Sequence, residues 1–228
     1  MKVIAHVYSD FPEKFGVPRQ SGLVPELTAR IVFEPEYRHP EALRGIEEFE
    51  YLWILWQFSL VGREGYQPTV RPPRLGGNTR VGVFATRSPF RPNPVGLSSV
   101  KLEHVEWDTP EGPVLVVSGA DMVSGTPVYD IKPYLPYTDS HPEAKAGFTD
   151  HLSPYLLRVD IDGEILGKLG QSLSTGQITA LKGILAEDPR PSYQNDPDRV
   201  YTMSYAGLEV RFRVSEGTLR VTEVFHKE

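Results

Sequence analysis

The sequence of 228 residues contains no cysteine, which excludes disulfide bonds, thiolate metal sites and a cysteine nucleophile. No apolar run approaches the roughly 20 residues that a membrane-spanning helix needs. The N-terminal stretch MKVIAHVYSD lacks the longer apolar segment and the cleavage site of a secretory signal. We therefore expect a globular, cytoplasmic protein, either one large domain or a domain with a smaller partner.

Several motifs of common enzyme classes are also absent. The six histidines are dispersed and show neither HExxH nor any paired spacing, so we expect no metal site. There is no G-x-S-x-G elbow, no G-x-x-x-x-G-K-[ST] phosphate loop, and no strand followed by G-x-G-x-x-G that opens a helix. These absences argue against a serine hydrolase, a P-loop nucleotidase and a Rossmann dinucleotide-binding protein.

The positive charge is concentrated in one part of an acidic chain. The net charge is −6, yet residues 63–101 hold six arginines and one lysine against a single glutamate. Arginine binds phosphate or carboxylate through two parallel hydrogen bonds, whereas a merely solubilising surface more often uses lysine. The window favours an anionic ligand. The alternative is that these arginines are solvated or paired with acids elsewhere in the fold.

The first part of the chain has the pattern of a β protein. Short runs rich in β-branched and aromatic residues are bounded by Pro, Gly or Asp: KVIAHVY, LTARIVF, YLWILWQF, RVGVFAT, SVKLEHVEW and VLVVSG. Only residues 39–50, HPEALRGIEEFE, have helical spacing there. Several short strands without long helices between them favour a barrel or a sandwich over a doubly wound sheet.

A polar stretch over residues 137–154 predicts a division of the chain. We place the first domain at residues 1–140 and a small α+β domain at residues 141–228. The second domain should contain a strand in YLLRVDID, a helix within residues 174–188 with Ser174 or Thr175 as its N-cap, and closing strands in LEVRFRV and LRVTEVF.

Four loops of the first part combine proline with charged or amide side chains. They cover residues 17–26, 68–80, 85–96 and 121–137. Proline fixes φ and lowers the entropy that a loop loses on ordering, so such loops can hold polar groups in place for a ligand. For any single loop the alternative is a rigid connection between strands, but four of them on one domain favour a binding site.

The same loops resemble a known family. VPRQSGL, TVRPPRLGGN, VGVFATRSPFRPNPVGLS and SGTPVYDIKPYLPY are similar to motifs of the TrmO family, also called YaeB or TsaA-like, and LAEDPRPSY (185–193) is similar to its late motif. The resemblance implies a mainly β fold, with an N-terminal barrel that binds S-adenosylmethionine without a Rossmann sheet, a small C-terminal domain, and a homodimer. It also implies N6-methylation of threonylcarbamoyladenosine at tRNA position 37, beside the anticodon.

The matching motifs suggest the cofactor ligands. The resemblance assigns to the S-adenosylmethionine pocket Pro18, Arg19, Gln20, Arg87, Leu97 and the loop of Asp121, Met122, Val123, Ser124, Gly125 and Thr126. After the strand YLWILWQF the family commonly has His-Gln, whereas this chain has Ser59 and Leu60. Ser59 and Leu60 thus also match the cofactor pocket by position, where the side-chain contacts of the family pair are not carried over and backbone contacts stay open.

The chemistry suggests further residues. The carbamoyl group on the acceptor nitrogen withdraws electrons, so a positioned base would help its proton to leave. Asp130 is our first candidate, with Lys132, Tyr134 or Arg91 binding the modified base or its carboxylate. The alternative for Asp130 is a strand-end carboxylate that only pairs with Lys132.

Contacts to RNA are expected from the same loops. Arg71, Arg74 and Arg91 are candidates for binding phosphates, and the aromatic residues Phe90, Tyr129, Tyr134 and Tyr137 for stacking on bases. Each aromatic residue could instead anchor its loop. Two other function classes stay open: a non-enzymatic barrel that senses a small anion, and an RNA-binding module that has lost its cofactor.

Overall fold

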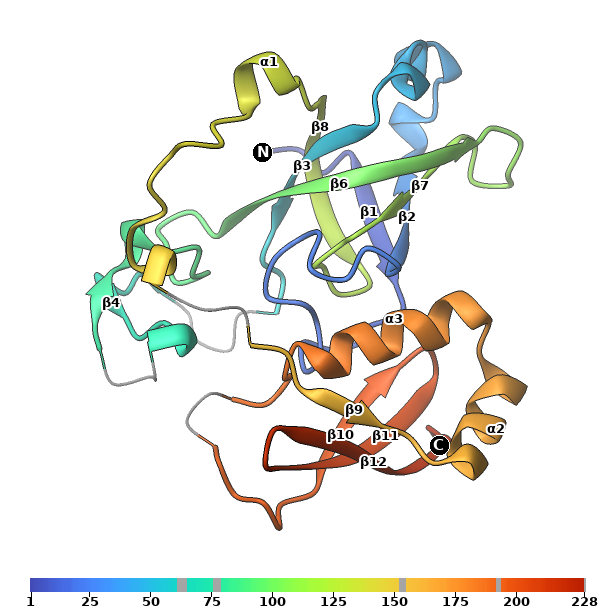
Figure 1. Ribbon diagram of the computed structural model, residues 1–228. Helices are drawn as coiled ribbons and strands as arrows, with labels where there is room; N and C mark the ends of the chain where they lie inside the picture. Colours follow the sequence, from blue (N-terminus) through green and yellow to red (C-terminus); the bar gives the residue numbers. More distant parts are fainter. Residues whose placement is uncertain (61–64, 76–78, 152–154, 192–193, 228) are drawn as a thin grey trace.

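The computed structural model describes residues 1–60, 65–75, 79–151, 155–191 and 194–227, and of Arg74 only the backbone. Figure 1 shows two units, a closed β-barrel built by the first part of the chain and a sheet with two helices built by the last part. The expected fold class, a mainly β protein with an N-terminal barrel and a small α+β C-terminal part, is confirmed.

Six strands close the barrel in the order β1-β2-β7-β6-β3-β8. Their bounds are β1 Ala5–Ser9, β2 Thr28–Phe33, β3 Tyr51–Gln57, β6 Val95–Glu106, β7 Val114–Ser118 and β8 Thr126–Pro133. Every neighbouring pair is antiparallel, including the closing pair of β1 with β8. Closure removes the exposed sheet edges that would otherwise pair with other chains.

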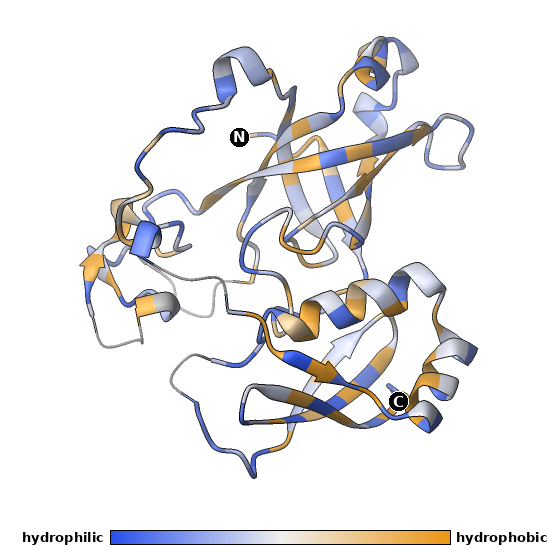
Figure 2. Ribbon diagram, viewed as in Figure 1, coloured by the Kyte–Doolittle hydropathy of each residue, from blue (hydrophilic) through white to orange (hydrophobic). Residues whose placement is uncertain are grey.

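Alternating side chains divide each strand between the barrel interior and its outer surface. In β3 the residues Leu52, Ile54 and Trp56 are buried, while the residues between them face outward. Strand β6 alternates in the same way, which Figure 2 shows as successive bands of hydrophobic and hydrophilic residues. This period of two lets one sheet present an apolar core and a polar surface at once.

Two local predictions were wrong. The segment 121–137, read as a loop, contains β8, whose hydrogen bonds to β1 and β3 override the low strand propensity of its two prolines. Residues 39–50, expected as one helix, form two short 3₁₀ helices, Pro40–Leu43 and Ile46–Glu48. Gly45 between them has a φ of 85°, a left-handed conformation that ends the first turn.

A separate lobe connects β3 to β6. It holds the two-stranded hairpin of β4 (Thr69–Val70) and β5 (Val81–Gly82), followed by a short 3₁₀ helix over Val83–Ala85. The expected strand RVGVFAT is therefore only partly a strand. Figure 1 shows the lobe beside the barrel. A further 3₁₀ helix covers Gly147–His151.

The second unit is a four-stranded sheet in the order β10-β11-β12-β9, with helices α2 and α3. Their bounds are β9 Arg158–Asp160, α2 Gly163–Ser172, α3 Thr175–Ala186, β10 Tyr201–Tyr205, β11 Leu208–Ser215 and β12 Thr218–His226. The expected helix is confirmed with Ser174 as its N-cap: its hydroxyl accepts from Gln177 N, and the Gln177 side chain accepts from Ser174 N. Strand β10 and helix α2 were not predicted.

The segment between β1 and β2 contributes apolar side chains to the second unit. Phe11, Val24 and Leu27 are buried in the same core as the residues of α3 and β10–β12. The side chain of Gln177 also donates to Asp10 at 3.2 Å. The barrel keeps its own core, and this segment links the first part of the chain to the core of the second unit. A short helix, α1 (Pro136–Asp139), follows β8. Within the described ranges, no helix has the length and apolar character needed to span a membrane.

Candidate functional site

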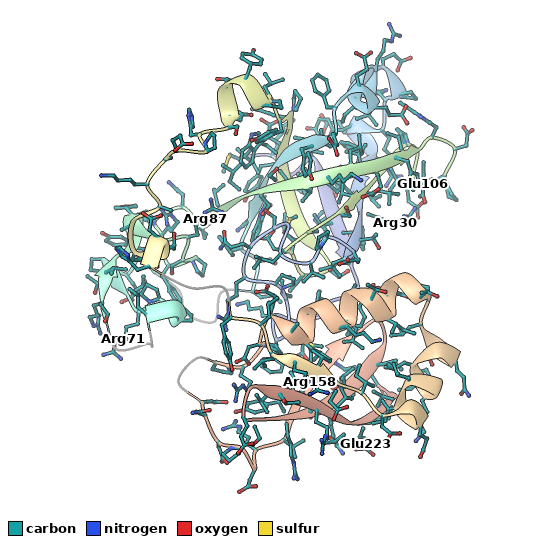
Figure 3. The ribbon with its side chains drawn as sticks, viewed as in Figure 1. Arg30, Arg71, Arg87, Glu106, Arg158 and Glu223 are labelled. Carbon is teal, nitrogen blue, oxygen red and sulfur yellow. The ribbon has the colours of Figure 1, made fainter. Side chains whose placement is uncertain are left out.

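Three segments far apart in sequence meet at one end of the barrel. The guanidinium of Arg87, from the lobe, donates to the side-chain oxygen of Gln20, from the β1–β2 segment. Arg87 also lies near the carboxyl of Asp121, which follows β7. Figure 3 shows Arg87 where the lobe meets the barrel. The fold thus brings together three of the residues that the sequence assigned to one pocket.

The carboxyl of Asp121 is held by a buried chain of hydrogen bonds. Trp56 Nε1 donates to Ser98 Oγ at 2.9 Å, and Ser98 Oγ donates to Asp121 Oδ1 at 2.6 Å. Burial raises the pKa of Asp121 above its usual value, while Ser98, Arg87 and the backbone of Ser21 act in the opposite direction. The chain therefore orients a carboxyl whose charged form the low-polarity barrel end disfavours.

The remainder of the loop Asp121–Thr126 presents backbone more than side chains. Met122, Val123 and Thr126 are buried, and the Thr126 hydroxyl donates to the carbonyl of Val123 at 2.8 Å. Ser124 N donates to Phe11 O and Gly125 N to Val7 O, both at 2.7 Å. These bonds fix the loop against β1. The side chains of the three buried residues thus pack into the protein, and their assignment to the cofactor pocket stays a prediction.

Leu97, Ser59 and Leu60 are exposed. Leu97 is 53% exposed and Leu60 is 45% exposed, on the outer side of β6 and after the end of β3. The backbone bond from Phe58 N to Pro94 O, 2.9 Å long, holds the two segments together. This bond holds the segment of Ser59 and Leu60 next to the proline-rich loop.

Pro18 and Arg19 lie at the junction with the second unit. A pocket of about 240 Å³ there is lined by residues 14–19, Pro73, Ile184 and residues 187–191. Arg19 donates to the carbonyl oxygens of Asp188 and Arg190, at 3.2 and 3.1 Å. The Arg190 side chain, only 10% exposed, pairs with Asp188 at 2.8 Å. Arg19 therefore fixes this loop to the late motif.

The register across three strands places Asp130 on the same outer face as Leu97. Leu97 in β6 is opposite Leu55 in β3, and Leu55 is opposite Asp130 in β8. Neighbouring strands lie about 4.8 Å apart, so the backbones of Asp130 and Leu97 are about 10 Å apart. Asp130 Oδ2 pairs with Lys132 Nζ at 2.7 Å, and its other oxygen accepts from Ile131 N. The pairing that the sequence left open as the alternative is therefore present.

An aromatic surface continues from Asp130 along this face. The ring of Tyr134 packs on Trp53 and Tyr51, with centroid distances of 5.4 and 6.3 Å. Trp53 Nε1 donates to Asp139 at 2.8 Å, and Asp139 also accepts from Leu135 N, which together hold the pKa of this carboxyl below its usual value. Tyr137 is 87% exposed on α1, whereas Tyr129 donates to the side chain of Gln57 in β3.

The expected RNA ligands lie in the lobe. Arg71 is exposed at its outer edge (Figure 3), whereas Arg91 Nη1 donates to the carbonyls of Val83 and Thr86. The carbonyl of Phe90 accepts from Gln67 N. Arg91 and Phe90 thus help to shape the lobe, and the side chain of Arg74 lies outside the described part of the structure.

Trp56 and Ser98 were missed by the sequence analysis. A signal for Ser98 exists, because it occupies an inward position of β6 between Gly96 and Val100, where a barrel normally places apolar residues. A small polar residue there needs a partner inside the barrel. In the described part of the chain, no three histidine, aspartate or glutamate side chains lie together as metal ligands would.

Comparison with known proteins places these features in a family. The tRNA-methyltransferase O N-terminal domain matches residues 6–140, and the TrmO C-terminal domain matches residues 154–227. A tRNA (adenine(37)-N6)-methyltransferase of Escherichia coli (strain K12) is 40% identical over 222 residues, covering 96% of this chain and 94% of that protein.

Two further proteins come from Pseudomonas aeruginosa. A putative S-adenosylmethionine-dependent methyltransferase, RcsF, is 38% identical over 226 residues, covering 97% of this chain and 95% of its own. The crystal structure of TrmO from the same species superposes with a TM-score of 0.79 at 31% identity, covering 98% of this chain and 96% of that one.

Proposed function

This chain belongs to the TrmO family, and on that premise we propose that it is an S-adenosylmethionine-dependent tRNA methyltransferase acting on N6 of adenine 37. The observation that carries the proposal is the convergence of Gln20, Arg87 and Asp121 at the barrel end, beside the exposed Leu97. Family members over nearly the whole length of the chain have this activity by name. The threonylcarbamoyl form of the base is the acceptor that we propose.

The residues at the barrel end fit S-adenosylmethionine. The cofactor carries a carboxylate, an amino group, ribose hydroxyls and an adenine ring. Arginine binds a carboxylate, a buried aspartate accepts from hydroxyl or amino groups, and exposed leucines offer an apolar surface for a ring. Arg87 and Asp121 lie close together and supply the first two chemistries, and the exposed Leu97 and Leu60 offer the third. Bound there, the cofactor supplies a methyl group that its sulfonium already activates.

Alignment of the two reactants is then the main task of the protein. Holding reacting groups in the right geometry supplies several kcal/mol of the barrier without a covalent intermediate. The loops that do this are stiffened by proline and tied by hydrogen bonds: Arg91 to the carbonyls of its own loop, Arg19 to the late motif, and Ser98 to Asp121. A loop fixed in this way loses little entropy when its ligand binds.

We propose Asp130 as the acceptor of the N6 proton and Lys132 as the group that keeps it oriented. Their 2.7 Å contact holds the Asp130 carboxylate beside the Lys132 ammonium and so fixes its orientation. Asp130 shares an outer face with Leu97, so a base held between them would have its nitrogen near both. Tyr134 continues the same face and offers a ring for stacking.

The first test combines cofactor binding with turnover. Titration calorimetry measures S-adenosylmethionine affinity, and mass spectrometry of nucleosides from threonylcarbamoyl-modified tRNA measures methyl transfer. We expect both in the native protein, and a loss of cofactor affinity in Arg87→Ala. Arg30→Ala is the matched control, since Arg30 pairs with Glu106 on the opposite side of the barrel (Figure 3). Binding of RNA or of a small anion without turnover would favour the module or sensor classes instead.

The role of Asp130 needs a separate measurement. Single-turnover methyl transfer by Asp130→Asn should slow by about 100- to 10,000-fold, the usual contribution of a general base, with cofactor affinity unchanged. Asp108→Asn, on the exposed turn after β6, serves as the control for loss of one carboxylate. Full single-turnover rates in Asp130→Asn would remove the base assignment and leave the enzyme proposal standing.

Three further features are proposals that follow from the family. We propose a homodimer, a cytoplasmic location beside the tRNA pool, and a division of the chain into domains at residues 1–140 and 141–228. Since the segment around Phe11 lies in the core of the second unit, the first domain expressed without the second should expose apolar surface and aggregate. Light scattering of the full chain measures its oligomeric state directly.

A further inference from the structure

The lobe between β3 and β6 exposes two stacked aromatic rings that the site described above does not use. Phe84 is 69% exposed and Tyr66 is 47% exposed. Their ring centroids lie 6.3 Å apart, with an angle of 27° between the planes. Phe84 belongs to the 3₁₀ helix that follows β5, and Tyr66 precedes β4. Two large rings kept side by side in solvent form a surface that favours a flat partner.

Arginine completes this surface. The guanidinium of Arg91 lies 5.4 Å from the centroid of the Phe84 ring, while its Nη1 holds the carbonyls of Val83 and Thr86 at 3.1 and 2.7 Å. The same arginine therefore fixes the helix that carries Phe84 and places a cation against its ring. A cation at the face of an aromatic ring is attracted by the ring quadrupole.

The surroundings select an anionic partner. Arg71, Arg80 and Arg87 are exposed on the same lobe, and the backbone bonds Gln67 N to Phe90 O and Val83 N to Pro68 O tie its segments together. The rest of the chain is acidic. Unpaired RNA combines flat bases, which stack on aromatic rings and arginine, with phosphates, which arginine binds. Charge and shape together match this ligand.

We propose that Tyr66 and Phe84 form a stacking platform for an unpaired RNA base that neighbours the base being methylated. The inference rests on the proposed function, since it places the platform beside the cofactor end of the barrel. Phe84 precedes Arg87 by three residues, so their Cα atoms are at most about 11 Å apart. In this arrangement a nucleotide adjacent to the target in the same loop stacks on the platform, while the target base is bound at the barrel.

The test measures RNA affinity by fluorescence anisotropy with a fluorescein-labelled RNA hairpin that has adenines in its loop. Phe84→Ala should weaken binding about 5- to 150-fold, because base stacking on an aromatic ring is worth about 1–3 kcal/mol. Tyr66→Ala should weaken it in the same direction, and Phe84→Trp should keep the affinity. Affinity for a blunt duplex of the hairpin stem should not change, since a duplex offers no unpaired base.

Tyr8→Ala is the matched control. Tyr8 is 50% exposed on β1, opposite Arg30 in β2, on the side of the barrel away from the lobe. Cofactor affinity measured by calorimetry should be the same in all four variants. Equal hairpin affinity in Phe84→Ala and Tyr8→Ala would refute the platform, as would a dimer in light scattering that Phe84→Ala dissociates without a change in hairpin affinity.

Failure of the platform and failure of the proposed function give different results. If the native protein transfers no methyl group to tRNA, the proposed function is wrong whatever the variants do. If the native protein methylates tRNA, and Phe84→Ala binds RNA and methylates tRNA equally well, only the proposal of a stacking platform is wrong. Slow methylation by Phe84→Ala that recovers at saturating tRNA supports the platform, because the lost contact is then one of binding and not of chemistry.

Discussion

Replacing Ser98 with alanine tests how much the hydrogen-bond chain inside the barrel contributes to the free energy of unfolding. The Ser98 side chain is buried, donates to Asp121 Oδ1 at 2.6 Å and accepts from Trp56 Nε1 at 2.9 Å. In the alanine variant the indole N–H of Trp56 and the carboxyl oxygen of Asp121 both lose the Ser98 hydroxyl as their hydrogen-bond partner. Each buried polar group left unpaired costs about 1–3 kcal/mol, so unfolding free energy should fall by about 2–6 kcal/mol.

Urea unfolding at neutral pH measures this loss against Ser118→Ala. Ser118 is also buried in the barrel and donates to Glu103, whose side chain is 35% exposed. Water can replace that hydroxyl, so the control should lose only about 0.5–1.5 kcal/mol. A loss of that size is small against the 5–15 kcal/mol of a typical domain, whereas the Ser98 loss takes up a large part of it.

A double-mutant cycle with Trp56→Phe separates the two broken bonds. Trp56→Phe removes the indole N–H, so Ser98→Ala should lower the free energy of unfolding less in that background than in the native protein. Cofactor affinity should also fall in Ser98→Ala, since Asp121 loses the group that orients it. Equal stability losses in Ser98→Ala and Ser118→Ala, or strict additivity in the cycle, would refute the reasoning.

Three more predictions concern the same region and the junction. Gly96→Ala should destabilise the barrel by about 1–3 kcal/mol, because the new Cβ would lie 2.2 Å from the Trp56 ring. Adding Trp56→Leu to this variant should recover part of the loss, as measured by urea unfolding. Unchanged stability in Gly96→Ala would contradict the close contact between Gly96 and Trp56. The raised pKa of Asp121 means that the folded protein keeps this proton when the unfolded chain has released it. The free energy of unfolding should therefore fall as pH rises from the usual pKa of 3.8 through the raised pKa. Urea unfolding of Asp121→Asn at several pH values should lack this decline. The same dependence on pH in Asp121→Asn and in the native protein would contradict the prediction. Asp188→Asn should cost about 3 kcal/mol, since it leaves the largely buried Arg190 without its ion pair; thermal unfolding measures it, with the exposed Asp160→Asn, whose partner Arg220 is in water, as the control that should change little.

Part of the fold could be read from local sequence because local physics decides it. Strands β2, β3 and β7 alternate or are uniformly apolar between turn residues, and each formed where expected. Helix α3 began where expected for the same reason, because Ser174, one of the two expected N-cap residues, bonds with a residue only three positions away. The family motifs identified the loops around the candidate site. The two closing strands of the second unit, β11 and β12, formed where their β-branched runs predicted them.

Strand β8 shows why the remainder could not be read in this way. Pro127, Asp130 and Pro133 disfavour a strand, yet bonds from β1 and β3 on its two sides fix it, and β1 lies more than a hundred residues away in sequence. No local pattern contains these partners. The helix expected over residues 39–50 failed for a related reason, since Gly45 takes a left-handed conformation that spacing of apolar residues does not report.

The sequence by itself determined the β-rich character of the first part, the capped helix of the second, the concentration of arginine in residues 63–101, and the motifs that identify the family. Only the tertiary structure decided that Ser98 holds Asp121, that Asp130 shares a face with Leu97, and that Phe84 stacks on Tyr66. The physical reason is that strand register and barrel closure join residues that are distant in the chain, and the free energy of those contacts outweighs local conformational preference.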